Sequence, residues 1–542
     1  MKKKLIAALL TASMTAALLA GCGNGAAEEG AEDPAPATDE SGDDGEEEGG
    51  GDAGTDADSD ADADGEEDLA EITVSFWSLA GVPDEENKAM VEDAINEITE
   101  AEINTTVHLN IMDVGSYIPN GAMANGVANG EDFDLVVTAA ALSGHYNVMM
   151  SNGMLEPITD LLNEYAPELM ATIPEGYLDA TSKDGEVYAV PSYSNKVKNM
   201  FWIARNSALD AANIDINTIK TIDDLDAALH AIKETSPDLI PLSGASFTMN
   251  LTYPGFAFGS GNRGWDPLGE STAVAAAVYC DDETMTAVSR YETDEFKKDI
   301  EYLKKWYDDG LLDKDTATDS ATGSAIMDKD NAASEIYVGQ ADIASTRAAA
   351  SGSSYVQLTD SYLSTGSMQQ FTWAIPVSCD EPEAAAKFMN LVFTNADIVN
   401  LLNYGIEGTH YVKKDDGTVA FPEGVTAENA GYYMGGLTAI LGNGFLSYPW
   451  EGADPNSAEM GKKEMENAKY SPLMGFNLDT AALGDIYTAL CPIANQEYGP
   501  ALFCGSAPDG YYEEFIQKMK DAGLDEYLKQ VNEQIQAWKA QQ

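Results

Sequence analysis

The stretch Ile72-Thr73-Val74-Ser75-Phe76-Trp77 decides the fold. It is rich in β-branched and aromatic residues, which predicts a buried strand. Residues 84–101 follow with apolar side chains at helical spacing, and residues 105–112 return to the alternating pattern of a strand. Strand, helix and strand in this order predict an α/β protein with a parallel sheet covered by helices. Ligands are expected near the carboxyl ends of such strands.

The same alternation continues along the chain. Residues 134–137 and 187–191 are expected strands, and a helix is expected at residues 158–165 between them. After Pro191 a strand at residues 199–204 restarts the pattern. The remaining expected helices span residues 221–234, which Thr221 caps, 296–309, 382–393, 396–402, 509–522 and 524–541.

The first residues have the pattern of a secretory signal. Three lysines precede an apolar run, which is too short and too weakly apolar to span a bilayer. The run ends in Leu19-Ala20-Gly21-Cys22, which resembles the bacterial lipoprotein signal. The resemblance implies that residues 1–21 are a signal peptide and that Cys22 carries acyl chains such as palmitate. A lipid on Cys22 would anchor the chain to the cell membrane.

Residues 22–70 are interpreted as a disordered acidic tether. Between Gly23 and Ala70 there are 20 acidic residues and no Lys or Arg, so ordering this segment would bury little apolar surface. The spacing from Asp60 to Glu71 matches a calcium-binding loop. The flanks are an acidic repeat and an expected strand rather than two helices, so we interpret the match as chance and expect no metal.

Composition narrows the function further. The formal net charge of −63 argues against binding nucleic acid or anionic lipid headgroups. The cysteines beyond Cys22 are far apart and have no metal-ligand spacing. Cys491 and Cys504 are either a disulfide in an oxidising compartment or two buried thiols.

Several blocks in a fixed order indicate a family. They are Tyr188-Ala189-Val190-Pro191, Gly339-Gln340-Ala341-Asp342, Trp373-Ala374-Ile375-Pro376 with residues 381–389 after it, residues 404–411, and Ser471-Pro472-Leu473-Met474-Gly475-Phe476. With the first strand, these blocks resemble the family 1 extracellular solute-binding proteins of bacterial ABC importers. They also resemble a lipoprotein subgroup that carries a C-terminal domain of unknown function. The resemblance covers residues 71–542.

This resemblance implies a two-lobed, periplasmic-binding-protein-like fold of type II with hinge crossovers. Lobe one is expected at residues 71–190 with 348–410, and lobe two at residues 191–347 with 411–542. The crossings are expected near Pro191, Arg347 and Tyr411.

The resemblance also implies a function. The chain is expected to capture a carbohydrate, an oligosaccharide, in the cleft between the lobes and to deliver it to ABC permease subunits. It is expected to be a monomer without cofactor or metal, anchored on the extracellular face of the membrane of a Gram-positive bacterium.

Candidate ligand-binding residues follow from what a sugar site needs. Aromatic faces contact pyranose rings, and planar polar groups bind the hydroxyls. Side chains of these kinds at expected strand ends and loops are Trp77, Ser78, Tyr193, Arg263, Trp265, Asp266, Arg347, Trp373 and Tyr411. Core packing is the alternative for each aromatic residue, and a surface ion pair is the alternative for Arg263. Trp202 and Trp306 lie within periodic elements and are expected in the core.

Two other functions remain open. The four histidines are scattered and no catalytic motif is present, so we do not expect an enzyme. A glycoside-active enzyme needs only two placed carboxylates, however. A surface receptor for a peptide or another small solute on the same scaffold is the second alternative.

Overall fold

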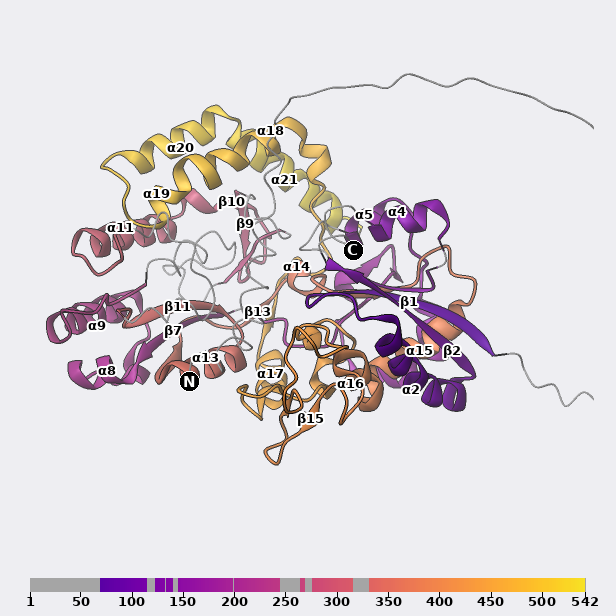
Figure 1. Cartoon of the computed structure of the whole chain (residues 1–542). Coiled ribbons are helices and arrows are strands. Elements are labelled where there is room, and N and C mark those ends of the chain that lie inside the picture. The colour runs from indigo at the N-terminus through magenta and orange to yellow at the C-terminus, as the bar shows by residue number, and fades with distance from the viewer. Residues whose placement is uncertain are drawn as a thin grey trace, which may run out of the picture.

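The computed structural model describes residues 69–114, 122–131, 133–139, 145–197, 199–243, 264–268, 275–314 and 331–541. These residues form two lobes that lie side by side (Figure 1). The expected signal peptide, Cys22, residues 23–68 of the acidic tether and Arg263 lie outside the described residues, and of the acidic residues in the calcium-loop pattern only Glu71 lies within them. Ala70, expected in the tether, begins β1.

A five-stranded sheet forms the centre of the first lobe. Its strand order is β2 (Thr105–Asp113), β1 (Ala70–Ser78), β3 (Leu135–Thr138), β14 (Thr372–Ala374) and β6 (Val190–Pro191). The strands predicted at residues 72–77, 105–112 and 134–137 are therefore confirmed, and they are parallel. β14 is antiparallel to both of its neighbours, so the sheet is mixed rather than wholly parallel. The reason is that β14 enters the sheet from the other lobe, at the edge where β6 leaves.

Helices pack on this sheet because their buried residues recur at helical spacing. In α2 (Glu85–Ile103) these are Val91, Ile95 and Thr99, and the Asp84 carboxylate caps the first turn. The other helices of the first lobe are α4 (Ala122–Asn129), α5 (His145–Ser151), α6 (Thr159–Tyr165), α7 (Pro167–Thr172), α14 (Thr365–Met368), α15 (Pro382–Thr394), α16 (Ala396–Tyr404) and α17 (Ser457–Glu466). Short strands β4 (Ser182–Lys183), β5 (Glu186–Val187), β15 (Val412–Lys413) and β16 (Val419–Ala420) form two small hairpins, and η2 (Asp179–Thr181), η7 (Leu437–Ala439) and η8 (Gly444–Leu446) are 3-10 turns.

The second lobe is built on an antiparallel sheet of β11 (Ser334–Gly339), β7 (Asn199–Arg205) and β12 (Ser353–Gln357). One face is covered by α13 (Ala341–Ser351), and the other packs into the core of the lobe. The other elements of the lobe are α8 (Asn206–Ala212), η3 (Ile216–Thr218), α9 (Ile222–Thr235), β8 (Trp265–Asp266), β9 (Ala276–Tyr279), β10 (Val288–Ser289), η5 (Arg290–Glu292) and α11 (Asp294–Asp308).

C-terminal helices complete the second lobe (Figure 1). They are α18 (Thr480–Pro492), the π-helical turn η9 (Ile493–Tyr498), α19 (Gly499–Phe503), α20 (Tyr511–Asp521) and α21 (Leu524–Lys539). Phe515 of α20 packs edge-on against Tyr291 with ring centroids 5.1 Å apart. Asn532 of α21 exchanges two hydrogen bonds with the backbone of Ala287, which ties this helix to the β9–β10 hairpin.

Among the described residues, the chain passes between two separate hydrophobic cores at three places. The crossings lie between Val197 and Met200, between Val356 and Leu363, and between Met465 and Leu473. The second and third crossings pair as parallel strands β13 (Tyr362–Leu363) and β17 (Lys469–Tyr470).

Two crossings therefore differ from the expected positions near Arg347 and Tyr411. β12, expected in lobe one, pairs with β7 and belongs to the second lobe. Residues 411–465, expected in lobe two, supply Tyr432, Leu437 and Met465 to the core of the first lobe. Short strands and irregular segments carry no periodic signal that assigns them to a lobe, which is why both boundaries were misplaced.

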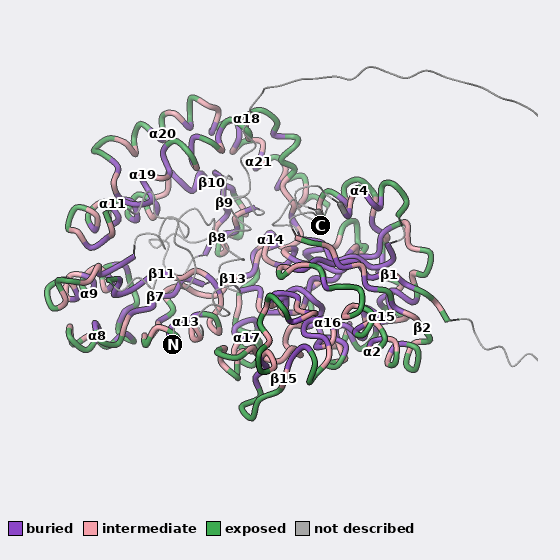
Figure 2. The backbone as a smooth tube through the Cα atoms, in the orientation of Figure 1, coloured by how far each residue is buried: buried purple, intermediate pink, exposed green. Residues whose placement is uncertain are grey.

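The two cores account for the stability of the lobes. Figure 2 shows buried backbone concentrated in the sheets and on the inner sides of the helices. Trp202 and Trp306 are both 0 % exposed, which confirms that they are core residues. Burying a large side chain of this kind stabilises a fold by about 2–3 kcal/mol.

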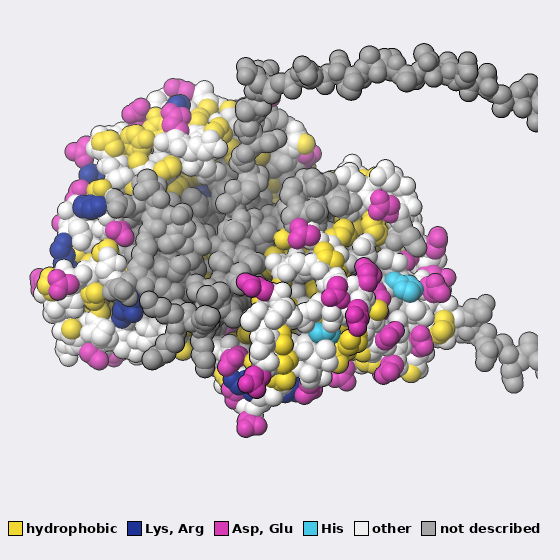
Figure 3. Space-filling model, viewed as in Figure 1, with side chains coloured by type: hydrophobic (Ala, Val, Ile, Leu, Met, Phe, Trp, Pro, Cys, Tyr) yellow, Lys and Arg dark blue, Asp and Glu magenta, His cyan; other side chains and the backbone are white. Residues whose placement is uncertain are grey.

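Three further features of the described residues are the charge of the surface, the state of the cysteines and the hydrophobicity of the helices. Acidic side chains are spread over the visible face of the first lobe, where basic ones are few (Figure 3). Cys280, Cys379, Cys491 and Cys504 are all free thiols in the structure. Among the helices of the described residues, none has the length and apolar character needed to cross a membrane.

Candidate functional site

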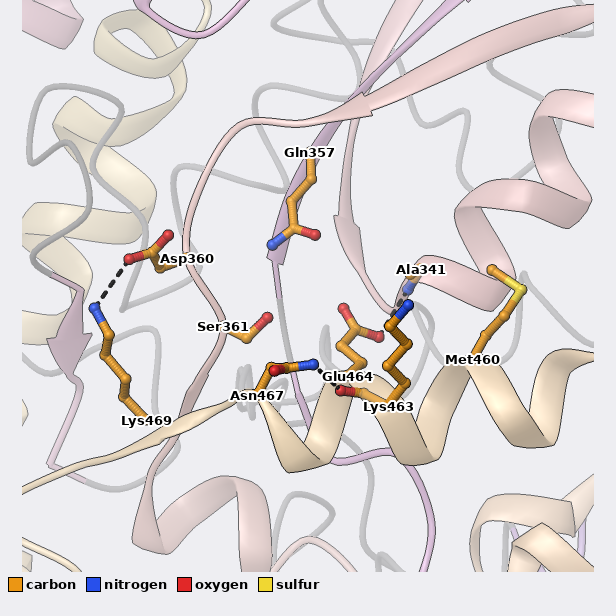
Figure 4. A pocket seen from close by; sticks show the side chains of 9 residues that line it. All are labelled: Ala341, Gln357, Asp360, Ser361, Met460, Lys463, Glu464, Asn467 and Lys469. Atoms are coloured by element: carbon orange, nitrogen blue, oxygen red, sulfur yellow. Dashed lines mark hydrogen bonds and ion pairs between the residues drawn. The ribbon is translucent and has the colours of Figure 1, made fainter. Parts of the chain in front are cut away.

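A polar pocket lies where the two lobes meet (Figure 4). Its volume is about 500 Å³, within the usual range for small-molecule sites. The second lobe contributes the start of α13 and the end of β12, the first lobe contributes α17, and the second and third crossings supply the rest. The lining residues are Ala341, Gln357, Asp360, Ser361, Met460, Lys463, Glu464, Asn467 and Lys469.

Glu464 is the most connected side chain of this pocket. It stands on α17 in the first lobe and is 8 % exposed. Its Oε1 accepts the amide of Asn199 at 2.5 Å, and its Oε2 accepts the amide of Asn195 at 2.6 Å. The same Oε2 accepts the backbone N–H of Ala341, the first residue of α13, at 3.0 Å. One carboxylate thus joins the first lobe, the first crossing and a helix N-terminus of the second lobe.

Asp342 lies beside this carboxylate in the first turn of α13. Burial, and then the nearby charge of Glu464, raise the pKa of Asp342 to about 6. Burial also raises the pKa of Glu464, against the hydrogen bonds that favour its charged form. The carboxyl group of Glu464 lines the pocket, and next to it lies the carboxyl group of Asp342, whose pKa is about 6.

Other polar groups face the same space (Figure 4). Lys469 pairs with Asp360 at 3.0 Å across the third and second crossings. Gln357 and Ser361 offer an amide and a hydroxyl, and Asn467 offers a second amide at the end of α17. Amides, hydroxyls and charged groups in one pocket are suited to a ligand with many hydroxyls.

The structure places Trp77, Ser78 and Trp373 inside the first lobe. All three are 0 % exposed. The Trp373 indole N–H donates to the carbonyl of Ile440 at 3.2 Å, and Ser78 Oγ accepts the N–H of Ala80 at 3.1 Å. These side chains line the carboxyl edge of the sheet from within and have no exposed face in this structure.

Trp265 and Asp266 lie on β8 of the second lobe. The Trp265 ring lies on Tyr279, with centroids 4.0 Å apart. Asp266 accepts hydrogen bonds from the Ser471 hydroxyl and from the N–H of Leu268, and burial raises its pKa. This carboxyl group therefore attaches β8 to the third crossing.

Arg347 is held within the second lobe. It pairs with Glu335 of β11 at 2.8 Å, and its guanidinium lies over the Tyr337 ring at 4.6 Å. Both members of the ion pair are buried, the arginine at 9 % and the glutamate at 0 % exposure. The pair fixes α13 on its sheet.

Tyr193 and Tyr411 differ in their surroundings. Tyr193, which precedes the first crossing and packs against the first core, is half-buried between Tyr177 and Phe445, with centroids 5.5 and 5.0 Å away. Tyr411 is 5 % exposed and packs against Tyr404 at 5.7 Å. Among the predicted residues that the structure describes, the side chains therefore do not come together in one site.

The pocket residues were missed because their roles depend on tertiary contacts. Lys463 and Glu464 stand in a run of charged residues that is typical of a solvated helix face. Only the block Gly339-Gln340-Ala341-Asp342, which was noted for its order in the chain, pointed to this region. Within the described ranges, no group of His, Cys, Asp or Glu side chains is placed to hold a metal ion.

Comparison with known proteins assigns most of the chain. Residues 94–405 match the family described as bacterial extracellular solute-binding protein. Residues 472–540, which include α18 to α21, match a domain of unknown function, DUF3502. The second match covers the helices that complete the second lobe.

Individual relatives agree with this match. A carbohydrate ABC transporter substrate-binding protein from Streptococcus pneumoniae serotype 4 is 25% identical over 449 residues, which are 81% of this chain and 85% of that protein. The crystal structure of the N-glycan transport solute-binding protein from Streptococcus pneumoniae is similar with a TM-score of 0.69 and 23% identity, covering 86% of this chain and 98% of that one. A structure of the same protein in complex with Man5GlcNAc gives a TM-score of 0.57 at 22% identity, with 86% and 97% covered. These structural likenesses establish the two-lobed fold.

Proposed function

Because this chain belongs to the family of bacterial extracellular solute-binding proteins, we propose that it captures an oligosaccharide between its lobes and delivers it to an ABC importer. The observation that carries the proposal is the pair of separately packed cores with a polar pocket at their junction. Two bodies joined by three described crossings can change their relative position, and a ligand that contacts both favours one arrangement.

The pocket suits a carbohydrate in size and chemistry. Its planar amides are Gln357, at the end of β12 of the second lobe, and Asn467, directly after α17 of the first lobe, and both can bind hydroxyls of one ligand. Tyr193 is an aromatic candidate close to this region, because Phe445, which packs edge-on against Tyr193, also contacts α17 at Gly461. The relatives that carry carbohydrate or N-glycan in their names support this class of ligand.

The lipid anchor belongs to the same proposal. Acylated Cys22 would hold the receptor on the extracellular face of a Gram-positive cell membrane, and the acidic tether would let it reach solution. Tethering raises the concentration of loaded receptor near the permease subunits. The receptor would act as a monomer, and it would release its sugar without altering it.

Calorimetry with the full-length chain in detergent tests the proposal. A panel of oligosaccharides is titrated, and each sugar is then analysed by mass spectrometry. We expect one oligosaccharide bound per chain and recovered intact. Recovery of a shortened sugar would replace the proposal with an enzyme, and binding of peptides but of no sugar would replace it with a peptide receptor.

Variants locate the ligand. Gln357→Ala and Asn467→Ala each remove one amide, and we expect each to weaken binding by about fivefold, since a hydrogen bond contributes about 1 kcal/mol. Glu459→Ala is the matched control, because Glu459 is an exposed residue of α17 outside the pocket lining. Unchanged affinity in both pocket variants would show that the ligand binds elsewhere.

A further inference from the structure

The contact between α13 and α17 is a direct bridge between the two lobes. α17 belongs to the first core through its residue Met465, and α13 packs on the sheet of the second lobe through Ala344 and Ala348. The bridge continues beyond Glu464, where Asp454 contacts the hydroxyls of Ser345 and Thr346 on α13. Movement of one lobe relative to the other must break or rebuild these contacts.

The two carboxyl groups in the bridge are not equivalent. Both oxygens of Glu464 accept hydrogen bonds, from Asn199, Asn195 and the Ala341 N–H. Asp342 Oδ1 is a buried atom that has no hydrogen-bond partner within the part of the chain that the structure describes, and the Asn195 side chain and the Ile343 backbone lower the pKa of this carboxyl group less than burial and Glu464 raise it. A buried carboxylate oxygen without a donor, next to a second carboxylate, favours the protonated form.

We propose that Asp342 and Glu464 together hold one proton and so fix the two lobes in the arrangement described here under mildly acidic conditions, and that loss of this proton releases them. The proton belongs to Asp342, because Glu464 is already satisfied as an anion. A neutral Asp342 removes the repulsion across the bridge. An ionised Asp342 restores it at a partly buried site, where the repulsion is screened less than at an exposed surface.

Other charges around Asp342 are few or already engaged. Glu464 is the facing acidic group on α17, and Asp454 is the acidic group at the far side of the bridge. The basic and titratable groups near the bridge are Lys196 on the first crossing, placed over the Phe371 ring, Lys463 at the pocket wall, and Arg347 with Glu335 and Tyr337 in the second lobe. The burial of Asp342 beside Glu464 therefore dominates its titration.

The direction of the pH dependence follows from the sign of the shift. The pKa of Asp342 in the folded chain is about 6, above the usual value of 3.8. A raised acid pKa contributes stability that is complete below the usual value and is lost as the pH rises through the folded value. The bridge should therefore be tight at pH 5 and loose at pH 7.5, with a ratio of about tenfold in its opening equilibrium.

Hydrogen exchange of the full-length chain tests this inference without any ligand. The amides of the first turn of α13, including the Ala341 N–H that donates to Glu464, report opening of the bridge. The internal reference is α9, a helix of the second lobe. We expect the protection of α13 relative to α9 to fall about tenfold between pH 5 and pH 7.5 in the wild type.

Variants separate this inference from a general effect of pH. Asp342→Asn keeps the shape of the neutral form, so its relative protection should stay high at both values. Glu464→Gln removes the neighbouring charge and should reduce the fall to about twofold or less. Glu459→Gln, an exposed change on α17, should retain the full fall.

The same fall in Asp342→Asn as in the wild type, or no fall in the wild type, would overturn the inference. Protection of α9 equal to that of the wild type shows that a variant has folded. One consequence rests on the proposed function: the lobes that capture the sugar move more easily at neutral pH, because the bridge is loose there. The exchange experiment contains no sugar, so either proposal can fail without the other.

Discussion

Glu464 satisfies three donors that belong to different parts of the chain, so its removal should have a large effect at the residue scale. Glu464→Ala leaves the amides of Asn195 and Asn199 and the Ala341 N–H without their acceptor. We expect a loss of about 2–4 kcal/mol in the free energy of unfolding, measured by denaturant titration. The exposed Glu459→Ala should change it by less than about 0.5 kcal/mol. Equal effects of the two variants would show that the junction contributes nothing to stability.

His410 makes a second prediction at this scale, with pH as the variable. Its Nδ1 accepts the N–H of Ile406 at 2.9 Å and its Nε2 donates to Asn87 Oδ1 at 2.8 Å, so the neutral ring fits the site. Burial lowers the pKa of His410. A lowered histidine pKa means that its contribution is complete above the ordinary value of about 6.5 and is lost as the pH falls below it.

The comparison of His410→Gln with the wild type isolates this effect. We expect the variant to unfold at lower denaturant at pH 7.5 and the difference between the two proteins to narrow at pH 5.5. His230→Gln is the control, because the His230 side chain is 37% exposed. A difference that is constant or widens toward acid pH would contradict the assignment of the neutral ring.

Few residues of the candidate site could be predicted from the sequence. Strand periodicity placed Trp77 correctly near the end of a strand, and Trp373 was chosen from a block of the family resemblance. Neither signal tells whether a side chain faces solvent or the core. Both are wholly buried. Asp342 and Glu464 are over a hundred positions apart in the chain, and no local pattern predicts their contact.

The helices are the elements that the sequence predicts best, because each carries its own signals. Thr221 was expected to cap a helix, and the structure confirms a capping box in which Thr221 and Asp224 satisfy each other's backbone N–H groups. Thr221→Ala should lower the free energy of unfolding by about 1 kcal/mol in denaturant titration. Thr235→Ala, in the last turn of the same helix, is the matched control and should have a smaller effect. The reverse order would show that the cap does not limit the stability of α9.

Short strands and irregular segments were predicted poorly for a physical reason. β12 has five residues, and its place is set by pairing with β7 rather than by its own pattern. Residues 411–465 pack on the first lobe through scattered side chains such as Tyr432 and Met465. Non-local contacts decide both, so the order of elements was predictable while the lobe boundaries were not.

At the scale of the whole molecule, the turn at Gly475 joins the two lobes after the third crossing. Its φ is +92°, and a Cβ there would lie 3.0 Å from the carbonyl oxygen of Asp179 in the first lobe. Gly475→Ala should therefore destabilise the chain by about 1–3 kcal/mol in denaturant titration. Gly452→Ala has a similar φ of +95° but open space around it, so it isolates the backbone strain from the close approach. Equal losses in both variants would show that the contact with Asp179 does not matter.

The two lobes and their crossings support the account of capture as a whole. The cores of the two lobes pack separately, so the lobes can move relative to each other at the three described crossings. The bridge between α13 and α17 joins the two lobes, so this movement must change its contacts.

The central claim is that the two lobes move when they capture an oligosaccharide, and a measurement of the distance between the lobes tests it most directly. Spin labels on unnatural amino acids at positions 93 and 210, exposed on α2 and α8, avoid the native cysteines and place one label on each lobe. We predict a shift of the distance distribution to shorter values when a saturating oligosaccharide binds. A sugar that binds tightly and leaves the distribution unchanged would contradict capture by movement of the two lobes.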